Sequence, residues 1–163
     1  MKRIGFIGFG LRSETMLKAF RALEADICVA AVADPRHAQI APGMKDDPYF
    51  AHTRWYGDEA ALLACDDLDG VFIGTRCPLH TPLACRVLKT GIPLFLEKPV
   101  CISREQYEAL REAGRGQEKR VVVSFPLRFS TITLEMEKLA RSGSLGRLTM
   151  VQAVNNVPYG SVY

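Results

Sequence analysis

Residues 4–13 read Ile-Gly-Phe-Ile-Gly-Phe-Gly-Leu-Arg-Ser, an apolar run that ends in two closely spaced glycines. The run predicts a buried strand over Arg3 to Ile7. A helix is predicted directly after it, over Leu11 to Glu24, because apolar residues recur there at helical spacing. A strand and a helix joined by a glycine turn form the first half of a βαβ unit, which predicts a parallel sheet.

Strand-like and helix-like segments continue to alternate along the chain. Further strands are predicted at Ile27 to Ala33, Thr53 to Tyr56, Gly70 to Gly74, Ile92 to Leu96 and Arg120 to Ser124. Helices are predicted within His37 to Tyr49, at Glu59 to Cys65, from Pro82 with Thr81 as its N-cap to Thr90, and from the Ser103 capping box to about Gly114. This order predicts an α/β protein, a doubly wound Rossmann fold with a mostly parallel sheet, over residues 1–124.

The pattern changes after residue 124. A helix predicted over Phe129 to Arg141 leads to a last strand over Leu148 to Val154, and the length of the chain leaves room for one domain and a fragment. A strand without most of its sheet has an unpaired edge. We therefore expect a homo-oligomer formed through this strand.

The glycine turn is the first candidate site. Gly8 makes a tight turn, Gly10 lets the backbone approach a pyrophosphate, and the following helix N-terminus offers amides and a positive dipole. Ser13 replaces the third glycine of the dinucleotide fingerprint and is small enough for close helix–strand packing. We expect Gly8, Phe9, Gly10, Leu11 and Arg12 to bind the cofactor; a glycine turn without a ligand is the alternative.

Asp34 ends the second predicted strand, where a carboxylate accepts hydrogen bonds from the adenosine ribose. This favours NAD, because a carboxylate repels the 2′-phosphate of NADP. Arg36 leaves NADP open as the cofactor, since a guanidinium can bind that phosphate. The alternative is a solvated Asp-Pro turn with a surface arginine.

The fifth predicted strand ends in Glu97-Lys98-Pro99, which places an amine at the carboxyl edge of the sheet. Open α/β sheets bind their ligands at this edge. Partial desolvation of an amine there favours loss of its proton, which suits proton transfer. Lys98 is therefore the catalytic candidate, with a structural salt bridge or a surface lysine as the alternative.

Composition and spacing exclude several other classes. The net charge of +3 comes without a basic block, which disfavours nucleic-acid binding, and no run approaches the roughly 20 apolar residues of a membrane span. Five cysteines without a CxxC pair indicate reduced thiols and a cytoplasmic protein. The histidines at 37, 52 and 80 lack metal-ligand spacing, so no metal site is expected.

Together these motifs resemble the Gfo/Idh/MocA family of NAD(P)-dependent oxidoreductases. The resemblance is carried, in order along the chain, by residues 5–13, 31–35, 69–75 with His80, 91–100, and Arg128 with 143–146. It implies hydride transfer between NAD(P) and a sugar or polyol hydroxyl or carbonyl. Glu97 would lie at the nicotinamide ribose, and Lys98, followed by a peptide bond that is often cis, would move a proton at the substrate.

The resemblance also implies cofactor contacts from Thr75 and His80, in a loop where Arg76-Cys77 replaces the usual Pro-Asn, and an Arg128 that points into the cleft. His80 just ahead of a capped helix and a solvent-facing Arg128 are the alternatives. The resemblance further implies that residues 125–163 are the start of a second α/β domain that carries substrate residues, truncated before most of its sheet. We therefore expect this chain alone to be inactive. A stand-alone dinucleotide-binding or sensing module, or a Rossmann-like domain that has lost its ligand, remains an alternative function.

Overall fold

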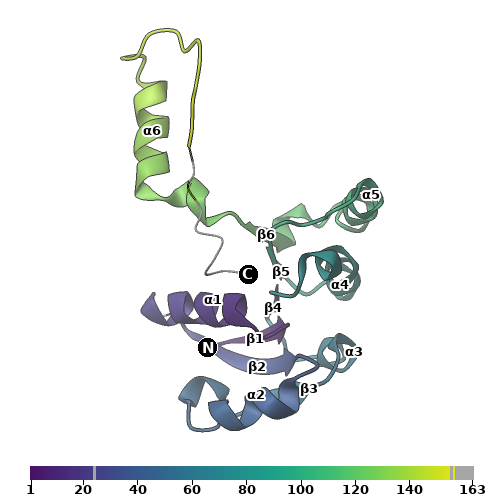
Figure 1. Cartoon of the computed structure of the whole chain (residues 1–163). Coiled ribbons are helices and arrows are strands. Elements are labelled where there is room, and N and C mark those ends of the chain that lie inside the picture. Colours follow the sequence, from purple (N-terminus) through teal and green to yellow (C-terminus); the bar gives the residue numbers. More distant parts are fainter. Residues whose placement is uncertain (24, 155, 157–163) are drawn as a thin grey trace. The chain divides into compact units, whose positions relative to one another are not determined.

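The computed structural model describes residues 1–23, 25–154 and 156. The chain divides into two compact units, Met1–Ser124 and Phe125–Tyr163. The first unit contains a six-stranded sheet with helices on both of its faces (Figure 1). The second unit contains one α-helix and a short 3-10 helix among its described residues.

All neighbouring strands of the sheet run parallel, in the order β3-β2-β1-β4-β5-β6. The strands are β1 (Lys2–Ile7), β2 (Ile27–Ala33), β3 (Arg54–Tyr56), β4 (Gly70–Ile73), β5 (Leu94–Glu97) and β6 (Val121–Ser124). This order confirms the predicted doubly wound Rossmann fold. The direction of winding reverses between β1 and β4, which makes their carboxyl ends the expected place for a ligand.

The helices form two layers. One face of the sheet carries α1 (Leu11–Ala22), α2 (His37–Met44) and the 3-10 turn η1 (Pro48–Phe50), and the other carries α3 (Glu59–Leu63), α4 (Cys77–Thr90) and α5 (Arg104–Ala113) (Figure 1). A short 3-10 helix, η2 (Glu118–Arg120), leads into β6. None of the helices in the described residues is long and apolar enough to cross a membrane.

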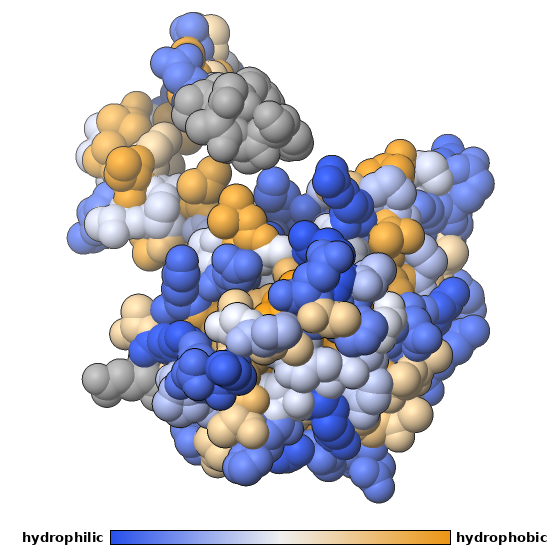
Figure 2. All heavy atoms as spheres, turned by 60° about the horizontal axis from the view of Figure 1, so that its bottom comes forward, coloured by the Kyte–Doolittle hydropathy of each residue, from blue (hydrophilic) through white to orange (hydrophobic). Residues whose placement is uncertain are grey.

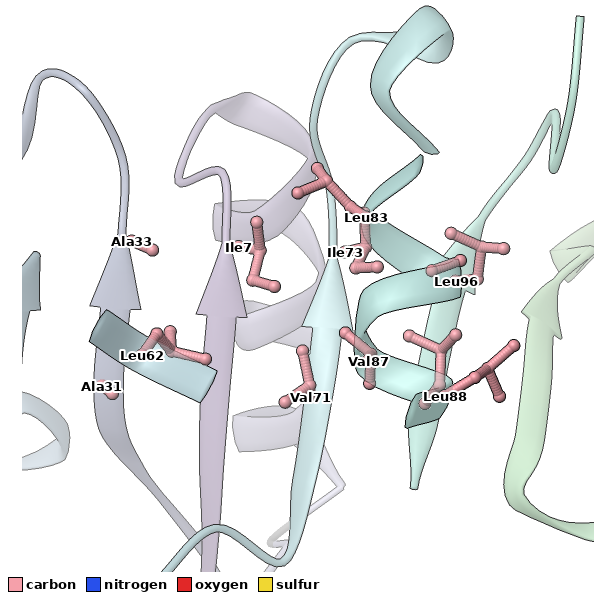
Figure 3. Packing of buried hydrophobic residues seen from close by; sticks show 12 residues of the cluster. Ile7, Ala31, Ala33, Leu62, Val71, Ile73, Leu83, Val87, Leu88 and Leu96 are labelled. Atoms are coloured by element: carbon pink, nitrogen blue, oxygen red, sulfur yellow. The ribbon is translucent and has the colours of Figure 1, made fainter. Parts of the chain in front are cut away.

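The strands supply both cores because successive side chains point to opposite faces. On β4, Val71 and Ile73 join an aliphatic cluster with α3 and α4, including Leu62 and Val87 (Figure 3). Phe72, between them, points the other way into an aromatic cluster under α1. Its ring lies 5.3 Å from that of Phe6 and 5.4 Å from that of Phe95, measured between centroids. A continuous apolar strand is therefore buried on both faces, as parallel sheets require.

Helix α4 begins five residues before the predicted start. Pro82 lies inside it, not at its first position, and Pro78 lies in its first turn. A proline at position 82 cannot donate to the carbonyl four residues earlier. That carbonyl, of Pro78, instead accepts a hydrogen bond from Gln106 Nε2 on α5, at 3.1 Å. The predicted cap, Thr81, donates to the carbonyl of Val100, at 2.8 Å. Tertiary contacts thus replace the missing helical bond.

The second unit contains η3 (Pro126–Phe129) and α6 (Thr131–Arg141), with the Ser130 side chain capping α6 by accepting from the Thr133 amide. Several of its apolar side chains are exposed, and hydrophobic surface is visible on this unit (Figure 2). The strand predicted over Leu148–Val154 is wrong: these residues have no regular secondary structure. A strand needs a hydrogen-bonding neighbour, and none of the described residues pairs with this segment.

We expect Phe72→Ala to lower the free energy of unfolding by about 3–5 kcal/mol, because Phe72 is 1% exposed and bridges two other rings. Urea unfolding followed by circular dichroism measures this loss. Val122→Ala is the matched control: Val122 lies on the edge strand β6 and is 57% exposed, so its effect should stay within about 0.5 kcal/mol. Equal losses for the two variants would contradict the assignment of the aromatic core.

Candidate active site

The predicted site residues of the first unit lie at the carboxyl ends of four parallel strands, in the loops that follow them or in the first turns of the next helices. The glycine turn follows β1, Asp34 follows β2, Thr75 follows β4, and Lys98 follows β5. Because these strands are adjacent in the order β2-β1-β4-β5, the loops meet along one edge of the sheet. Hydrogen bonds and close packing join the glycine turn to its neighbours on both sides.

Gly8 packs closely against Thr75, in the loop after β4. Its φ of +78° is unfavourable for other residues, and a Cβ at this position would lie 2.6 Å from Thr75 Cγ2 and 3.1 Å from the Thr75 backbone. The Gly8 amide donates to the carbonyl of Ala33 at 2.8 Å. The β1–α1 turn is therefore held directly against the loop after β4.

Ser13 occupies the position of the third fingerprint glycine, as close packing requires. It is fully buried, and its Oγ donates to the Gly8 carbonyl at 2.6 Å. A Cβ on Gly74, at the end of β4, would lie only 2.5 Å from Ser13 Oγ. Gly74 thus makes room for the serine. The sequence analysis did not assign Gly74, although a glycine at the end of the strand beside the fingerprint was a usable signal.

Gly10 differs from Gly8 because it faces open space. It is the N-cap of α1, has no side-chain cap, and has a φ of −111°. A Cβ there would have a single neighbour within 4 Å, Arg36 Nη2 at 3.9 Å. Within the described part of the chain, the amides of Leu11 and Arg12 donate to no protein acceptor. Free amides at a helix N-terminus above an open glycine fit a phosphate group.

The side chain of Phe9 does not face this space. It is 2% exposed and packs in the aromatic core, edge-on to Phe50 with 5.6 Å between ring centroids. Its amide donates to Asp34 Oδ2 at 2.9 Å. The ring of Phe9 therefore anchors the turn by filling the core beneath it, and the role of Phe9 as a cofactor-binding residue stays a prediction.

The carboxylate of Asp34 joins the end of β2 to the glycine turn. Besides the Phe9 amide, it accepts hydrogen bonds from Arg36 N at 2.8 Å, Nε at 3.2 Å and Nη2 at 3.3 Å. Burial disfavours its charge, but the hydrogen bonds from Arg36 and Phe9 prevail and lower the pKa of Asp34 below its usual 3.8. Asp34 is thus an ionised anchor that is paired with Arg36, whose side chain is 59% exposed.

At the other end of the edge, Glu97 is also held by an arginine. The Glu97 side chain is 4% exposed, and its Oε1 accepts from Arg12 Nε at 2.7 Å. Arg12 Nη2 donates to Ser124 Oγ, at the end of β6, at 3.1 Å. The start of α1 is therefore tied to β5 and β6. The sequence analysis missed Ser124, although its place at the carboxyl end of the last strand of the sheet was a usable signal.

Lys98 is exposed at the end of β5. The structure therefore does not show the partial burial expected for this residue, and its catalytic role stays a prediction. The Lys98–Pro99 peptide bond is cis, as the resemblance implied.

His80 does not face the open edge either. It lies in the first turn of α4, is 2% exposed, and has both ring nitrogens within hydrogen-bond distance of backbone carbonyls. It can act on a cofactor only through the loops that it holds. Arg128 belongs to the second unit, where it lies exposed on η3, and its role as a cofactor-binding residue stays a prediction.

The lowered pKa of Asp34 makes a prediction for acid stability. A carboxylate with a lowered folded-state pKa stabilises the fold above its unfolded value, here 3.8, and loses that contribution as the pH falls through the folded value. We expect Asp34→Asn to be less stable than the wild type at neutral pH, with the difference closing below pH 3.8. Urea unfolding over a pH series measures it. The exposed Asp66, as Asp66→Asn, serves as the control, and a gap for Asp34→Asn that stays constant with pH would contradict the assignment.

Comparison with known proteins places this geometry in a family. The model of the Gfo/Idh/MocA oxidoreductase family, NAD-binding Rossmann fold, matches residues 2–125. Inositol 2-dehydrogenase 2 of Saccharopolyspora erythraea is 28% identical over 153 residues, which are 93% of this chain and 44% of that protein. A glycosyl hydrolase family 109 protein of Shewanella sp. (strain W3-18-1) is 28% identical over 155 residues, which cover 90% of this chain and 33% of that protein.

The chain thus spans less than half the length of these relatives. Among solved structures, myo-inositol dehydrogenase from Lactobacillus casei in complex with NAD(H) and myo-inositol matches with a TM-score of 0.80 and 22% identity, over 90% of this chain and 43% of that one. This likeness shows the fold. Since the family model covers most of the sequence, the chain belongs to the Gfo/Idh/MocA oxidoreductases and contains their NAD-binding Rossmann domain.

Proposed function

We propose that residues 1–124 bind NAD along the carboxyl edge of the sheet and form the nucleotide-binding part of an oxidoreductase. The observation that carries this proposal is the contrast between the two glycines of the turn. Gly8 is packed against Thr75, whereas Gly10 faces open space beside uncapped amides of α1. Protein packing explains the first glycine but not the second, and a pyrophosphate held by the amides of Leu11 and Arg12 does explain it.

The other parts of the cofactor would be held on either side of this turn. Asp34 lies on the β2 side, where the adenosine ribose binds in dinucleotide folds, and Glu97 and Lys98 lie on the β5 side. Bound NAD supplies the acceptor or donor of a hydride. Both carboxylates are already paired with arginines, so the ribose hydroxyls would compete with the guanidinium groups for them.

Asp34 and Arg36 favour NAD without excluding NADP. The two contacts from the Arg36 side chain to Asp34 are longer than the one from the Phe9 amide, and the Arg36 side chain is more than half exposed. It can therefore turn away from Asp34 toward a 2′-phosphate. When the Arg36 guanidinium stays on Asp34, the negatively charged carboxylate lies at the ribose and disfavours the 2′-phosphate of NADP.

For the reaction, we propose hydride transfer between NAD(P) and a sugar or polyol hydroxyl or carbonyl. The names of the relatives support this class, since two of them act on inositols. Lys98 is exposed at the edge with its ammonium free to meet a substrate oxygen, and we assign it the movement of a proton at that oxygen. Residues 125–163, with Arg128 as a cofactor-binding residue, are proposed to begin the domain that holds the substrate.

The contrast between the two glycines makes a direct test. Gly10→Ala places a methyl group where the pyrophosphate would lie, so we expect the NADH dissociation constant to rise about tenfold or more, with a loss of stability of at most about 1 kcal/mol. Gly8→Ala instead meets Thr75 at a positive φ and should lower stability by about 1–3 kcal/mol.

Fluorescence titration of NADH and urea unfolding measure the two effects. Gly43→Ala, which meets nothing within 4 Å in α2, is the control and should leave NADH binding unchanged. NADH binding that is unaffected by Gly10→Ala would overturn the pyrophosphate assignment.

Removing the guanidinium tests the choice between the two cofactors. We expect Arg36→Ala to raise the NADPH dissociation constant about tenfold and to change that of NADH by less than about twofold, because only NADPH has a phosphate for this arginine. Arg115→Ala removes a comparably exposed arginine on the α5 side and should change neither. Parallel changes for NADH and NADPH would contradict the assignment of Arg36 to the 2′-phosphate.

A further inference from the structure

Arg76 is a cation without an acidic partner at the carboxyl edge of the sheet. It follows β4 and is the N-cap residue of α4, where its side chain is exposed and makes no capping hydrogen bond. None of the ion pairs among the described residues includes it. Its described hydrogen bonds are those that its backbone carbonyl accepts. The five N–H donors of its guanidinium can therefore bind a ligand.

The backbone of Arg76 lies beside the glycine turn. The packing of Gly8 against Thr75 leaves 3.1 Å between the Thr75 Cα and the point where a Gly8 Cβ would lie. Consecutive Cα atoms are about 3.8 Å apart, so the Arg76 Cα lies within about 7 Å of that point. The Arg76 carbonyl accepts hydrogen bonds from the Leu79 amide at 2.9 Å and from Thr75 Oγ1 at 3.4 Å. The backbone is thus fixed beside the proposed pyrophosphate site, and the side chain is left to bind.

The charges of this edge do not balance. Four cations and two carboxylates lie in the segments that form it, which are residues 8–12, 34–36, 74–76 and 97–101. Two of the cations are the arginines that pair with the buried carboxylates of Asp34 and Glu97. A guanidinium that left its carboxylate for a phosphate would uncover a buried charge, which costs free energy. The two positive charges that remain uncompensated are those of Arg76 and Lys98.

The order of the strands distinguishes these two cations. β4, which Arg76 follows, pairs directly with β1, whereas β5, which Lys98 follows, lies one strand farther away. Neighbouring strands are about 4.8 Å apart, so Arg76 begins closer to the glycine turn. A guanidinium also presents paired N–H groups that match two phosphate oxygens, whereas an ammonium is a point charge. Of the two, Arg76 is therefore the better placed for a pyrophosphate.

We propose that Arg76 is a further cofactor-binding residue, whose guanidinium binds the pyrophosphate of the dinucleotide from the β4 side. This inference rests on the proposed function. A pyrophosphate linkage carries two negative charges, and the N-terminus of a helix offers only about half a positive charge. The amides of Leu11 and Arg12 would hold the phosphate oxygens from the α1 side, and Arg76 would supply the full charge that those amides lack. Lys98 is then left for the substrate oxygen.

Fluorescence titration of Arg76→Ala with NADH tests this assignment. We expect the dissociation constant to rise about fivefold or more, and that of Arg76→Lys, which keeps the charge without the paired donors, to lie between the two. Lys89→Ala is the matched control and should bind NADH as the wild type does. Lys89 is exposed in the last turn of the same helix, it belongs to none of the described ion pairs, and its loss changes the net charge equally.

ADP-ribose identifies the part of the cofactor that Arg76 binds, because this molecule keeps the pyrophosphate and lacks the nicotinamide. Measured by competition with NADH, its dissociation constant should rise in Arg76→Ala by the same factor as that of NADH. Salt provides a second measurement, since it screens an exposed charge pair. Between about 0.05 M and about 0.5 M NaCl, we expect NADH binding to weaken more steeply in the wild type than in Arg76→Ala.

NADH binding that is as tight in Arg76→Ala as in the wild type would overturn the inference. So would a loss for NADH without a loss for ADP-ribose, which would assign Arg76 to the nicotinamide end, or an equal loss in Lys89→Ala, which would reduce the effect to net charge. If Arg76→Ala does not fold, the same comparisons with Arg76→Lys decide it. A wild-type chain that binds no NADH refutes the proposed function, whereas binding that depends on Gly10 but not on Arg76 refutes this inference alone.

Discussion

The close approach of Gly8 to Thr75 is the constraint on which the candidate site depends. It brings the turn after β1 against the loop after β4, at the point where the winding of the sheet reverses. Ser13 fixes the same turn from within, and Asp34 fixes it from β2 through the Phe9 amide. With its sides held in this way, the turn leaves the N-terminus of α1 uncapped and open, which is the arrangement that an anion requires.

Two pairs of a buried carboxylate and a partly exposed arginine flank this opening. Asp34 with Arg36 lies on the β2 side, and Glu97 with Arg12 lies on the β5 side. In each pair the arginine compensates a charge that could not otherwise be buried. Each arginine also lies between its carboxylate and solvent, so a ligand hydroxyl reaches the carboxylate only by displacing or sharing a guanidinium. The cofactor preference of this chain is thus a competition between charges.

The alternation of six strands with helices along residues 1–124 could be predicted from the sequence, because most of these strands are short apolar runs between helical patterns and local patterns decide that alternation. The start of α4 could not be predicted, because Pro82 removes a backbone donor inside the helix. Gln106 on α5 replaces this donor with its side chain, which donates to the Pro78 carbonyl. The strand predicted after α6 is wrong, because a strand depends on a hydrogen-bonding neighbour and an apolar pattern alone does not show one. At the site, glycine spacing and strand ends identified Gly8, Gly10 and Asp34, whereas the burial of Phe9 and His80 depends on tertiary packing.

The open amides at the start of α1 are proposed to bind the pyrophosphate of a dinucleotide. The most direct test is a titration of the nitrogen-15-labelled chain with NADH, followed through the backbone amide resonances. We expect saturable shifts of the amide resonances that are largest for Gly10, Leu11 and Arg12, with smaller shifts at the ends of β2 and β5. Shifts that do not saturate at about millimolar NADH, or that are largest away from the start of α1, would contradict it.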